Sequence, residues 1–246
     1  MKTPSDERLK PALAEELESV LYPYRTEYFQ IVRDWIESGR FGVNYPALLV
    51  EMFHIAKYSC PLMAHAREQL GNNATLKPYL EKHITEETGH DNWVLDDLGH
   101  LGMDRRLVRD STPLPETISL IGSQLYVIRY LQPVGFLGYL YVLESQPPSK
   151  EFLAYLREEF GISTQAMTFL IRHSQEDIHH RRELIDILDR CVSSPAEREA
   201  AIISAVMAHS CVNRLMARIA SGDFTTCLAQ DEKRSVAVRI ARGVPA

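Results

Sequence analysis

The sequence predicts an all-α fold, and three observations support that prediction. Long stretches repeat apolar residues at intervals of three and four, which is the spacing of one face of an α-helix. Glycine accounts for only 12 of 246 residues, and much of it falls at the breaks between these stretches. The chain contains no Asn-Gly or Asp-Gly pair, the usual signal of a tight β-hairpin.

Seven helices are expected from this pattern, and their ends carry recognisable signals. The expected ranges are 6–38, 45–70, 75–101, 114–145, 149–159, 162–191 and 195–221. Asn44 and Ser194 are cap residues that stand just before an early proline, as suits the first turn of a helix. Gly71 and Gly161 mark stops, and Pro133 is expected to kink the fourth helix.

The chain reads as one domain over residues 1–246, because it shows no internal repeat and no low-complexity linker. A helical core is expected at about 6–221, followed by a C-terminal arm at 222–246. The hydrophobic fraction of 45% and the charged fraction of 24% are those of an ordinary soluble globular protein.

Charge and hydropathy argue against several functional classes. The net charge is −6 with acids and bases interspersed, so we expect no nucleic-acid partner. Four cysteines without a CxxC pair fit a reducing cytoplasm better than a disulfide framework or a zinc ribbon. The most hydrophobic stretch, 125–143, contains Arg129, Pro133 and Gly135, which a membrane span rarely tolerates. We therefore expect a cytoplasmic protein with no membrane partner.

The most informative motif is a polar trio on an apolar helix face. His173, Asp177 and His180 are spaced i, i+4 and i+7, which stacks them on one face of a helix. The same stripe contains Leu170 before the trio and Leu184 after it, so the trio is expected to be buried. Two imidazoles and a carboxylate are costly to bury unless a partner neutralises them, and a metal ion does so.

Three more segments carry candidate ligands inside apolar helices. Glu51 interrupts a hydrophobic run, Glu87 and His90 form an E-x-x-H pair, and Glu144 ends another apolar run. Carboxylate and imidazole together suit non-haem iron or manganese, and di-iron bundles use E-x-x-H pairs with glutamates from neighbouring helices. The complete candidate set is Glu51, Glu87, His90, Glu144, His173, Asp177 and His180. Its four carboxylates would balance two divalent ions.

Each of these residues also has a structural explanation without a metal. A single E-x-x-H pair is more often a solvated surface, and Glu51 has Lys57 as a candidate ion-pair partner. His54 is either a ligand or a core histidine, and we leave it out of the set. His179 lies about 100° around the helix from His180, so it is expected to face away from the site.

The set and its spacing resemble the haem-oxygenase-like di-iron oxidases and oxygenases, also described as iron-containing redox enzymes. The resemblance covers roughly residues 45–190, and the H-x3-D-x2-H motif that begins at His173 is its most specific part. It implies a seven-helix bundle without haem, two iron ions held with modest affinity, and often a homodimer. It also implies that the di-iron(II) site reacts with O2, forms a peroxo-di-iron(III) species and oxidises a small molecule.

The resemblance also implies how the ligands divide between the two ions. One group is Glu87, His90, Glu144 and His180; the other is Glu51, His173 and Asp177, with Glu144 as a candidate bridge. The second-helix carboxylate varies in position within the family, so Glu81 and Glu86 are alternatives to Glu87. Glu87 is preferred because it shares a helix face with His83 and His90.

The resemblance implies amino acids, other amines or fatty acids as substrates, and an external electron donor as a further partner. Tyr126 and Tyr141 precede Glu144 and are candidates to line a pocket, while Arg129 is a candidate clamp for a carboxylate. This combination favours an amino acid or amine over a fatty acid. Two other classes stay open, namely a ferritin-like iron-oxidising or storage protein and a metal-free helical binding module.

Overall fold

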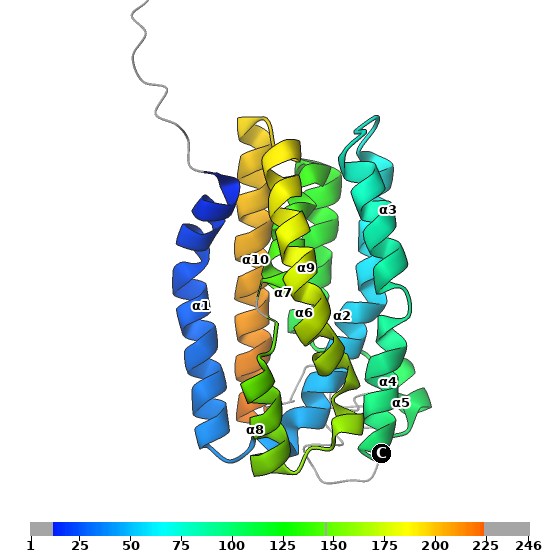
Figure 1. Ribbon diagram of the computed structural model, residues 1–246, viewed down its shortest axis with the longest axis vertical. Helices are drawn as coiled ribbons and strands as arrows, with labels where there is room; N and C mark the ends of the chain where they lie inside the picture. The colour runs from blue at the N-terminus through cyan, green and yellow to red at the C-terminus, as the bar shows by residue number, and fades with distance from the viewer. Residues whose placement is uncertain (1–11, 146, 224–246) are drawn as a thin grey trace, which may run out of the picture.

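The computed structural model describes residues 12–145 and 147–223, and within them every regular element is a helix (Figure 1). The all-α prediction is confirmed. The first expected helix begins at residue 6 and the expected C-terminal arm extends to residue 246, so residues 6–11 and 224–246 of these predictions lie outside the described part.

Within residues 12–145 and 147–223, ten α-helices replace the seven that were expected. Their bounds are α1 (Leu13–Glu37), α2 (Phe41–Gln69), α3 (Leu76–Glu87), α4 (His90–His100), α5 (Arg105–Arg109), α6 (Pro115–Tyr126), α7 (Leu137–Glu144), α8 (Lys150–Phe160), α9 (Thr168–Cys191) and α10 (Pro195–Ser221). The expected helix 75–101 divides into α3 and α4, the expected helix 114–145 divides into α6 and α7, and α5 is additional.

Both divisions have a local cause. Gly89 adopts a left-handed backbone with φ of 94°, which ends α3 and starts α4 in a new direction. After α6 the backbone continues as a π-turn, η1 (Val127–Leu131), then Gln132 is extended, and Pro133 starts a 3-10 turn, η2 (Pro133–Phe136). Proline lacks an amide hydrogen and disfavours a helical residue before it, so one long helix cannot form here.

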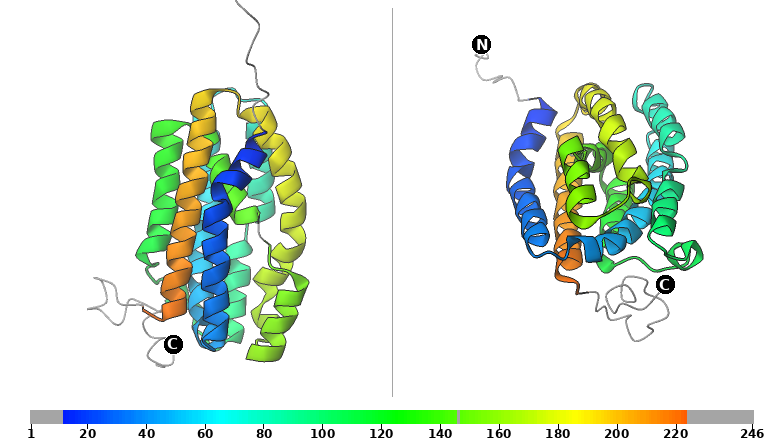
Figure 2. Two further views of the ribbon diagram at one scale, coloured as in Figure 1. Left: turned by 90° about the vertical axis from the view of Figure 1, so that its left-hand side faces the viewer. Right: turned by 60° about the horizontal axis from the view of Figure 1, so that its bottom comes forward.

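The helices form a bundle around α10, which packs against α1, α6 and α7 (Figures 1 and 2). On the other side α2 packs against α3 and α4, and α9 lies against α7 and α4. The helix α10 is long and apolar enough to cross a membrane, but 56% of its most apolar 18-residue stretch is buried inside the bundle. That burial is typical of a central bundle helix.

The apolar core consists of two clusters, one toward each end of the bundle. Along α9, Leu170 belongs to one cluster and Leu184 to the other. Along α2 the same division separates Phe53 from Leu62. The segment from His173 to His180 therefore crosses the space between the two apolar clusters.

Candidate metal centre

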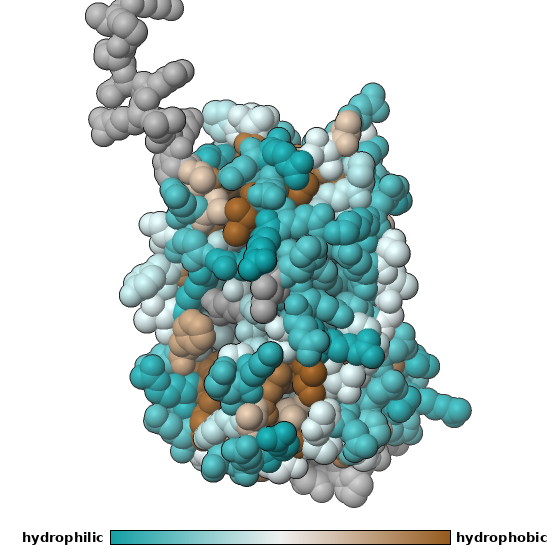
Figure 3. Space-filling model, viewed as in Figure 1, coloured by the Kyte–Doolittle hydropathy of each residue, from teal (hydrophilic) through white to brown (hydrophobic). Residues whose placement is uncertain are grey.

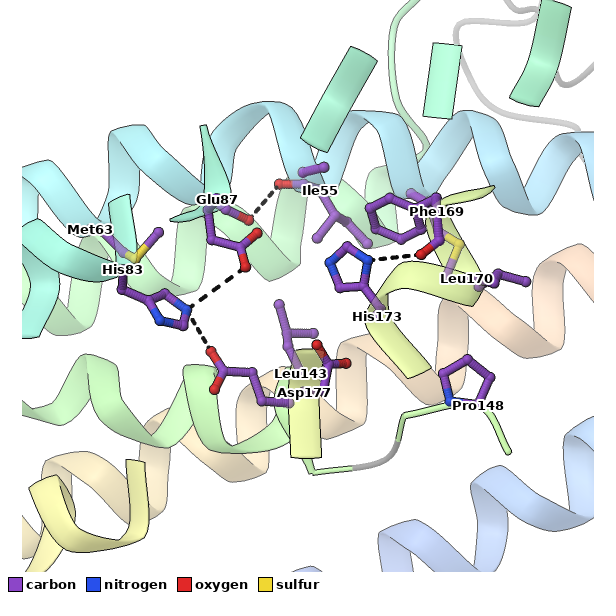
Figure 4. Close-up of a pocket in the computed structure, with 14 residues that line it drawn as sticks. Ile55, Met63, His83, Glu87, Leu143, Pro148, Phe169, Leu170, His173 and Asp177 are labelled. Atoms are coloured by element: carbon purple, nitrogen blue, oxygen red, sulfur yellow. Dashed lines mark hydrogen bonds and ion pairs between the residues drawn. The ribbon is translucent and has the colours of Figure 1, made fainter. Parts of the chain in front are cut away.

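Four helices direct acidic and imidazole side chains into the space between the apolar clusters. Two groups have ligand atoms that all lie within 4.8 Å of one another: His83, Glu86 and His180, and Glu87, His90 and His173. Glu144 and Asp177 line the adjoining cavity. Figure 4 shows His83, Glu87, His173 and Asp177 pointing toward one another from α3 and α9.

The break between α3 and α4 brings Glu87 and His90 together. Glu87 is the last residue of α3 and His90 is the first of α4, with the left-handed Gly89 between them. The Glu87 carboxylate lies 3.0 Å from Nδ1 of His90. The E-x-x-H pair therefore meets across a turn, and not on one continuous helix as the sequence suggested.

A buried carboxylate fixes the start of α9 and thereby the position of His173. The backbone amides of Thr168 and Phe169 donate to the fully buried Asp97 at 2.9 Å each. One turn later, Nδ1 of His173 lies 2.9 Å from the carbonyl oxygen of Phe169. A carbonyl only accepts hydrogen bonds, so Nδ1 carries the proton and Nε2 keeps its lone pair.

The protonation state of His173 suits a metal ligand. Burial lowers its pKa, which favours the neutral ring. A hydrogen bond from the other ring nitrogen to a carbonyl is the arrangement that orients metal-binding histidines in proteins.

Close helix packing places Glu144 in the cluster. A Cβ at Gly138 would overlap the carbonyl oxygen of Ala201, so only glycine lets α7 lie this close to α10. Glu144 ends α7, and its Oε1 lies 2.8 Å from Nε2 of His83. Its buried Oε2 has no hydrogen-bond partner, and neither has Nδ1 of His83.

The electrostatics of the cluster suit a bound cation. Burial, together with the charges of Glu144, Glu87 and Glu176, raises the pKa of Asp177 to about 8. Burial opposes ionisation of His83 as well, but the hydrogen bond and charge of Glu144 outweigh it and raise the pKa of His83. Carboxylates that repel one another, beside imidazole nitrogens without partners, are the donor set that a divalent transition metal neutralises.

A cavity of about 190 Å³ adjoins these donors. Its apolar wall consists of Met52, Ile55, Ala56, Met63, Leu143, Pro148, Phe169 and Leu170. Ser59 and the cluster residues supply the polar part, and no lysine or arginine belongs to the described lining. A small, mostly apolar molecule would therefore lie directly against the candidate ligands.

A family comparison agrees with this donor set. The model of the iron-containing redox enzyme family matches residues 47–211, which is more than half of the chain. The chain belongs to the iron-containing redox enzyme family. No curated protein matches it significantly.

Solved structures show that this family member has a haem-oxygenase-like fold. A domain of unknown function with this fold from Shewanella denitrificans is 21% identical, with a TM-score of 0.71 over 88% of this chain and 93% of that chain. A TenA homologue from Pseudomonas syringae pv. tomato is 13% identical, with a TM-score of 0.70 over 90% and 98%. A CADD-like protein of unknown function from Nostoc punctiforme is 19% identical, with a TM-score of 0.66 over 87% and 97%.

Six of the seven ligands expected from the sequence lie in or beside the cluster, and Glu51 is the exception. Glu51 is buried, but its carboxylate accepts hydrogen bonds from the Leu114 amide at 3.1 Å and the Thr117 hydroxyl at 2.6 Å. It therefore holds the start of α6 and does not line the cavity. Burial raises its pKa to about 7 despite these hydrogen bonds.

His83 is the residue that sequence reasoning missed. It is buried and contacts Glu144, and its ring centre lies 4.7 Å from that of His180. A signal was present in the sequence, because His83 precedes His90 by seven residues on an apolar face. The grouping also differs from the one that the resemblance implied: His180 lies with His83, and His90 lies with His173.

The two alternative carboxylates, Glu86 and Glu81, lie in different places. Glu86 joins the group of His83 and His180, with its carboxylate 3.7 Å from Nε2 of His180. Glu81 points away and pairs with Arg67 at 3.2 Å on the surface. Adjacent Glu86 and Glu87 thus both reach candidate metal groups, so a choice between them is unnecessary.

The expected substrate-binding residues do not line the cavity. Tyr126 and Arg129 are exposed on the outer side of the bundle. Tyr141 is buried, but its hydroxyl donates to Glu18 of α1. The chain unwinds after α6, so Tyr126 and Arg129 do not share a helix with Glu144, whereas Tyr141 lies on α7 with Glu144 but contacts Glu18 instead of the cavity.

Proposed function

We propose that this protein is a non-haem di-iron enzyme that uses O2 to oxidise a small amine or amino acid. The observation that carries the proposal is the convergence of four histidines and four carboxylates beside a small apolar cavity. Membership of the iron-containing redox enzyme family supports iron as the metal.

The chain's own residues would divide the work in the following way. His83, Glu86 and His180 would hold one ion, and Glu87, His90 and His173 the other. Bound iron would supply the activation of O2. The apolar cavity wall offers few hydrogen-bond partners to water, and the hydrogen bond from His173 to the Phe169 carbonyl orients that ligand.

The cavity favours a small amine over a fatty acid. Its volume of about 190 Å³ is below the range of roughly 300–1,000 Å³ that is usual for drug-sized ligands. A long acyl chain would not be enclosed. Glu144 and Asp177, which belong to neither ligand group, line the cavity, and a carboxylate complements an ammonium group better than it complements the carboxylate of a fatty acid.

An anaerobic iron(II) titration tests the metal site. We expect the metal-free protein to take up two ions per chain, and His180→Ala to lower this uptake. His179→Ala is the matched control, because His179 is exposed and lies next to His180 on the same helix. Equal uptake by the two variants, or no uptake by the folded wild-type protein, would contradict the metal assignment.

Exposure of the loaded protein to O2 tests the chemistry. We expect a transient visible absorption whose decay is accelerated by a small amine or amino acid in a substrate panel. Acceleration only by fatty acids would support the alternative substrate class. A ferritin-like protein would instead oxidise many iron(II) ions per chain without an organic substrate, in a large hollow oligomer.

A further inference from the structure

A tryptophan packs directly against the candidate metal centre. The ring centre of Trp93 lies 3.8 Å from that of His90 and the two planes differ by 25°, so the rings are stacked. Trp93 also meets His173 edge to face, with the ring centres 6.3 Å apart. Trp93 and His90 are three residues apart on α4, which places them on the same helix face. The indole is therefore in van der Waals contact with a candidate iron ligand.

The same indole borders solvent. Trp93 is half-buried, and the guanidinium of the exposed Arg172 lies 4.1 Å from its ring centre. Trp35, the second tryptophan of the chain, is instead buried against Phe41 in an apolar cluster. Figure 3 shows mostly hydrophilic side chains over α3 and α4, on the right of the view. Water and small hydrophilic molecules therefore have access to the edge of the Trp93 indole.

We propose that Trp93 donates single electrons to the metal centre when iron reacts with O2 and no substrate fills the cavity. This inference rests on the proposed iron site. Reduction of O2 to water takes four electrons and four protons; two iron(II) ions supply two of the electrons, and oxidation of a substrate supplies the other two. Without a substrate, the oxidised centre takes one electron from the indole, which then releases its Nε1 proton to water. Ascorbate, a one-electron reductant, returns an electron and water returns the proton, so two such cycles supply the missing pair.

Two features keep Trp93 from competing with a substrate. A substrate in the cavity lies directly against the candidate ligands, whereas Trp93 is not part of the described lining and reaches the ions only through His90. A cation beside an indole ring is attracted to the neutral ring and opposes the removal of an electron from it. Arg172 therefore restricts electron loss from Trp93 to a strong oxidant, such as the centre after its reaction with O2.

Tyr79 also stacks on a candidate ligand, but it is less suited to this role. Its ring centre lies 5.5 Å from that of His83, farther than Trp93 lies from His90. Its hydroxyl is buried and has no hydrogen-bond partner among the described residues. A phenol gives up an electron readily only when a partner accepts its proton, whereas an indole can lose the electron first and the proton afterwards. Tyr79 is therefore the matched control for Trp93.

Freeze-quench electron paramagnetic resonance of the iron-loaded protein tests the electron transfer. After mixing with O2 without substrate, we expect an organic radical whose hyperfine structure narrows when the protein carries indole-deuterated tryptophan, and which ascorbate removes. Trp93→Phe should lose this signal, and Tyr79→Phe should keep it. A signal that persists in Trp93→Phe, or that narrows only with ring-deuterated tyrosine, would overturn the proposal. Iron uptake without any radical would overturn this inference alone, whereas no iron uptake would overturn the proposed function as well.

Fluorescence during a cobalt(II) titration tests the contact between Trp93 and the centre without any reaction with O2. In Trp35→Phe the remaining tryptophan is Trp93, and bound cobalt(II), a paramagnetic ion, should quench most of its emission. In Trp93→Phe the remaining tryptophan is Trp35, and most of the emission should persist. Equal quenching in both variants, or bound cobalt(II) without quenching in Trp35→Phe, would overturn the proposal. Circular dichroism of each variant confirms that the helices are retained.

Discussion

Replacing Glu51 by glutamine separates two roles that this buried carboxylate could have. As a metal ligand it would bind iron, and as a cap it stabilises the start of α6 through Leu114 and Thr117. Burial raises the pKa of Glu51 from 4.5 to about 7. The cap role therefore predicts a specific dependence of stability on pH, and the ligand role predicts a loss of iron.

The magnitude follows from the two pKa values. A folded-state pKa above the unfolded value means that the protonated carboxyl stabilises the fold. This contribution is complete below pH 4.5 and is lost as the pH rises through about 7. The difference between 4.5 and about 7, at about 1.36 kcal/mol for each pKa unit, gives a loss of about 3 kcal/mol. Glutamine does not titrate, so Glu51→Gln should not show this loss.

Chemical denaturation of the metal-free protein between pH 4.5 and 8 measures the effect. We expect the free energy of unfolding of the wild type, relative to Glu51→Gln, to fall by about 3 kcal/mol over this range. Glu81→Gln is the control, because Glu81 is an exposed carboxylate paired with Arg67. It should change neither the pH dependence nor iron uptake. A difference between wild type and Glu51→Gln that does not vary with pH, or iron lost by that variant, would refute the cap role.

Three further predictions address the metal cluster, the helix packing and the cavity. Because the pKa of Asp177 is about 8, iron or zinc binding at pH 7 should release a proton from the wild type that Asp177→Asn does not release. Calorimetry in two buffers of different ionisation enthalpy measures the number of protons released. Equal release by both proteins would contradict the role of Asp177 in the metal cluster. Gly138→Ala should destabilise the fold by about 3 kcal/mol or more, because the methyl group of the new alanine overlaps the backbone of Ala201. An unchanged midpoint of denaturation would contradict this packing of α7 against α10. Ala56→Phe should fill the cavity. Iron uptake should then persist, while the substrate should no longer accelerate decay of the visible absorption after exposure to O2. Retained acceleration would mean that the substrate binds outside this cavity.

The helical fold and most of the cluster could be predicted from the sequence. Periodicity identifies most of the helical segments, because a bundle buries one face of a helix and leaves a pattern that repeats every 3.6 residues. His173, Asp177 and His180 share such a face, and their polarity within it indicates a common partner. These local features depend only on residues close together in the chain.

Helix breaks are harder to predict, although their residues are visible. Gly89 and Pro133 both lie inside helices that were expected to continue past them. A glycine or proline within a helical pattern is sometimes tolerated and sometimes ends the helix, so the residue type alone does not decide between the two outcomes. In the structure the helix ends at both places. The break at Gly89 lets Glu87 and His90 meet across a turn, whereas the break before Pro133 separates the helix of Glu144 from Tyr126 and Arg129, which are exposed.

The sequence by itself determined that Glu51 and His83 are polar residues on apolar helix faces, and therefore that each needs a buried partner. Only the tertiary structure decided which partner each one has. Packing of α2 against α6 gives Glu51 a backbone amide and a hydroxyl, whereas His83 on α3 reaches Glu144 of α7. Periodicity records that a side chain is buried, but the groups it meets belong to helices distant in sequence, whose contacts arise only when the helices pack.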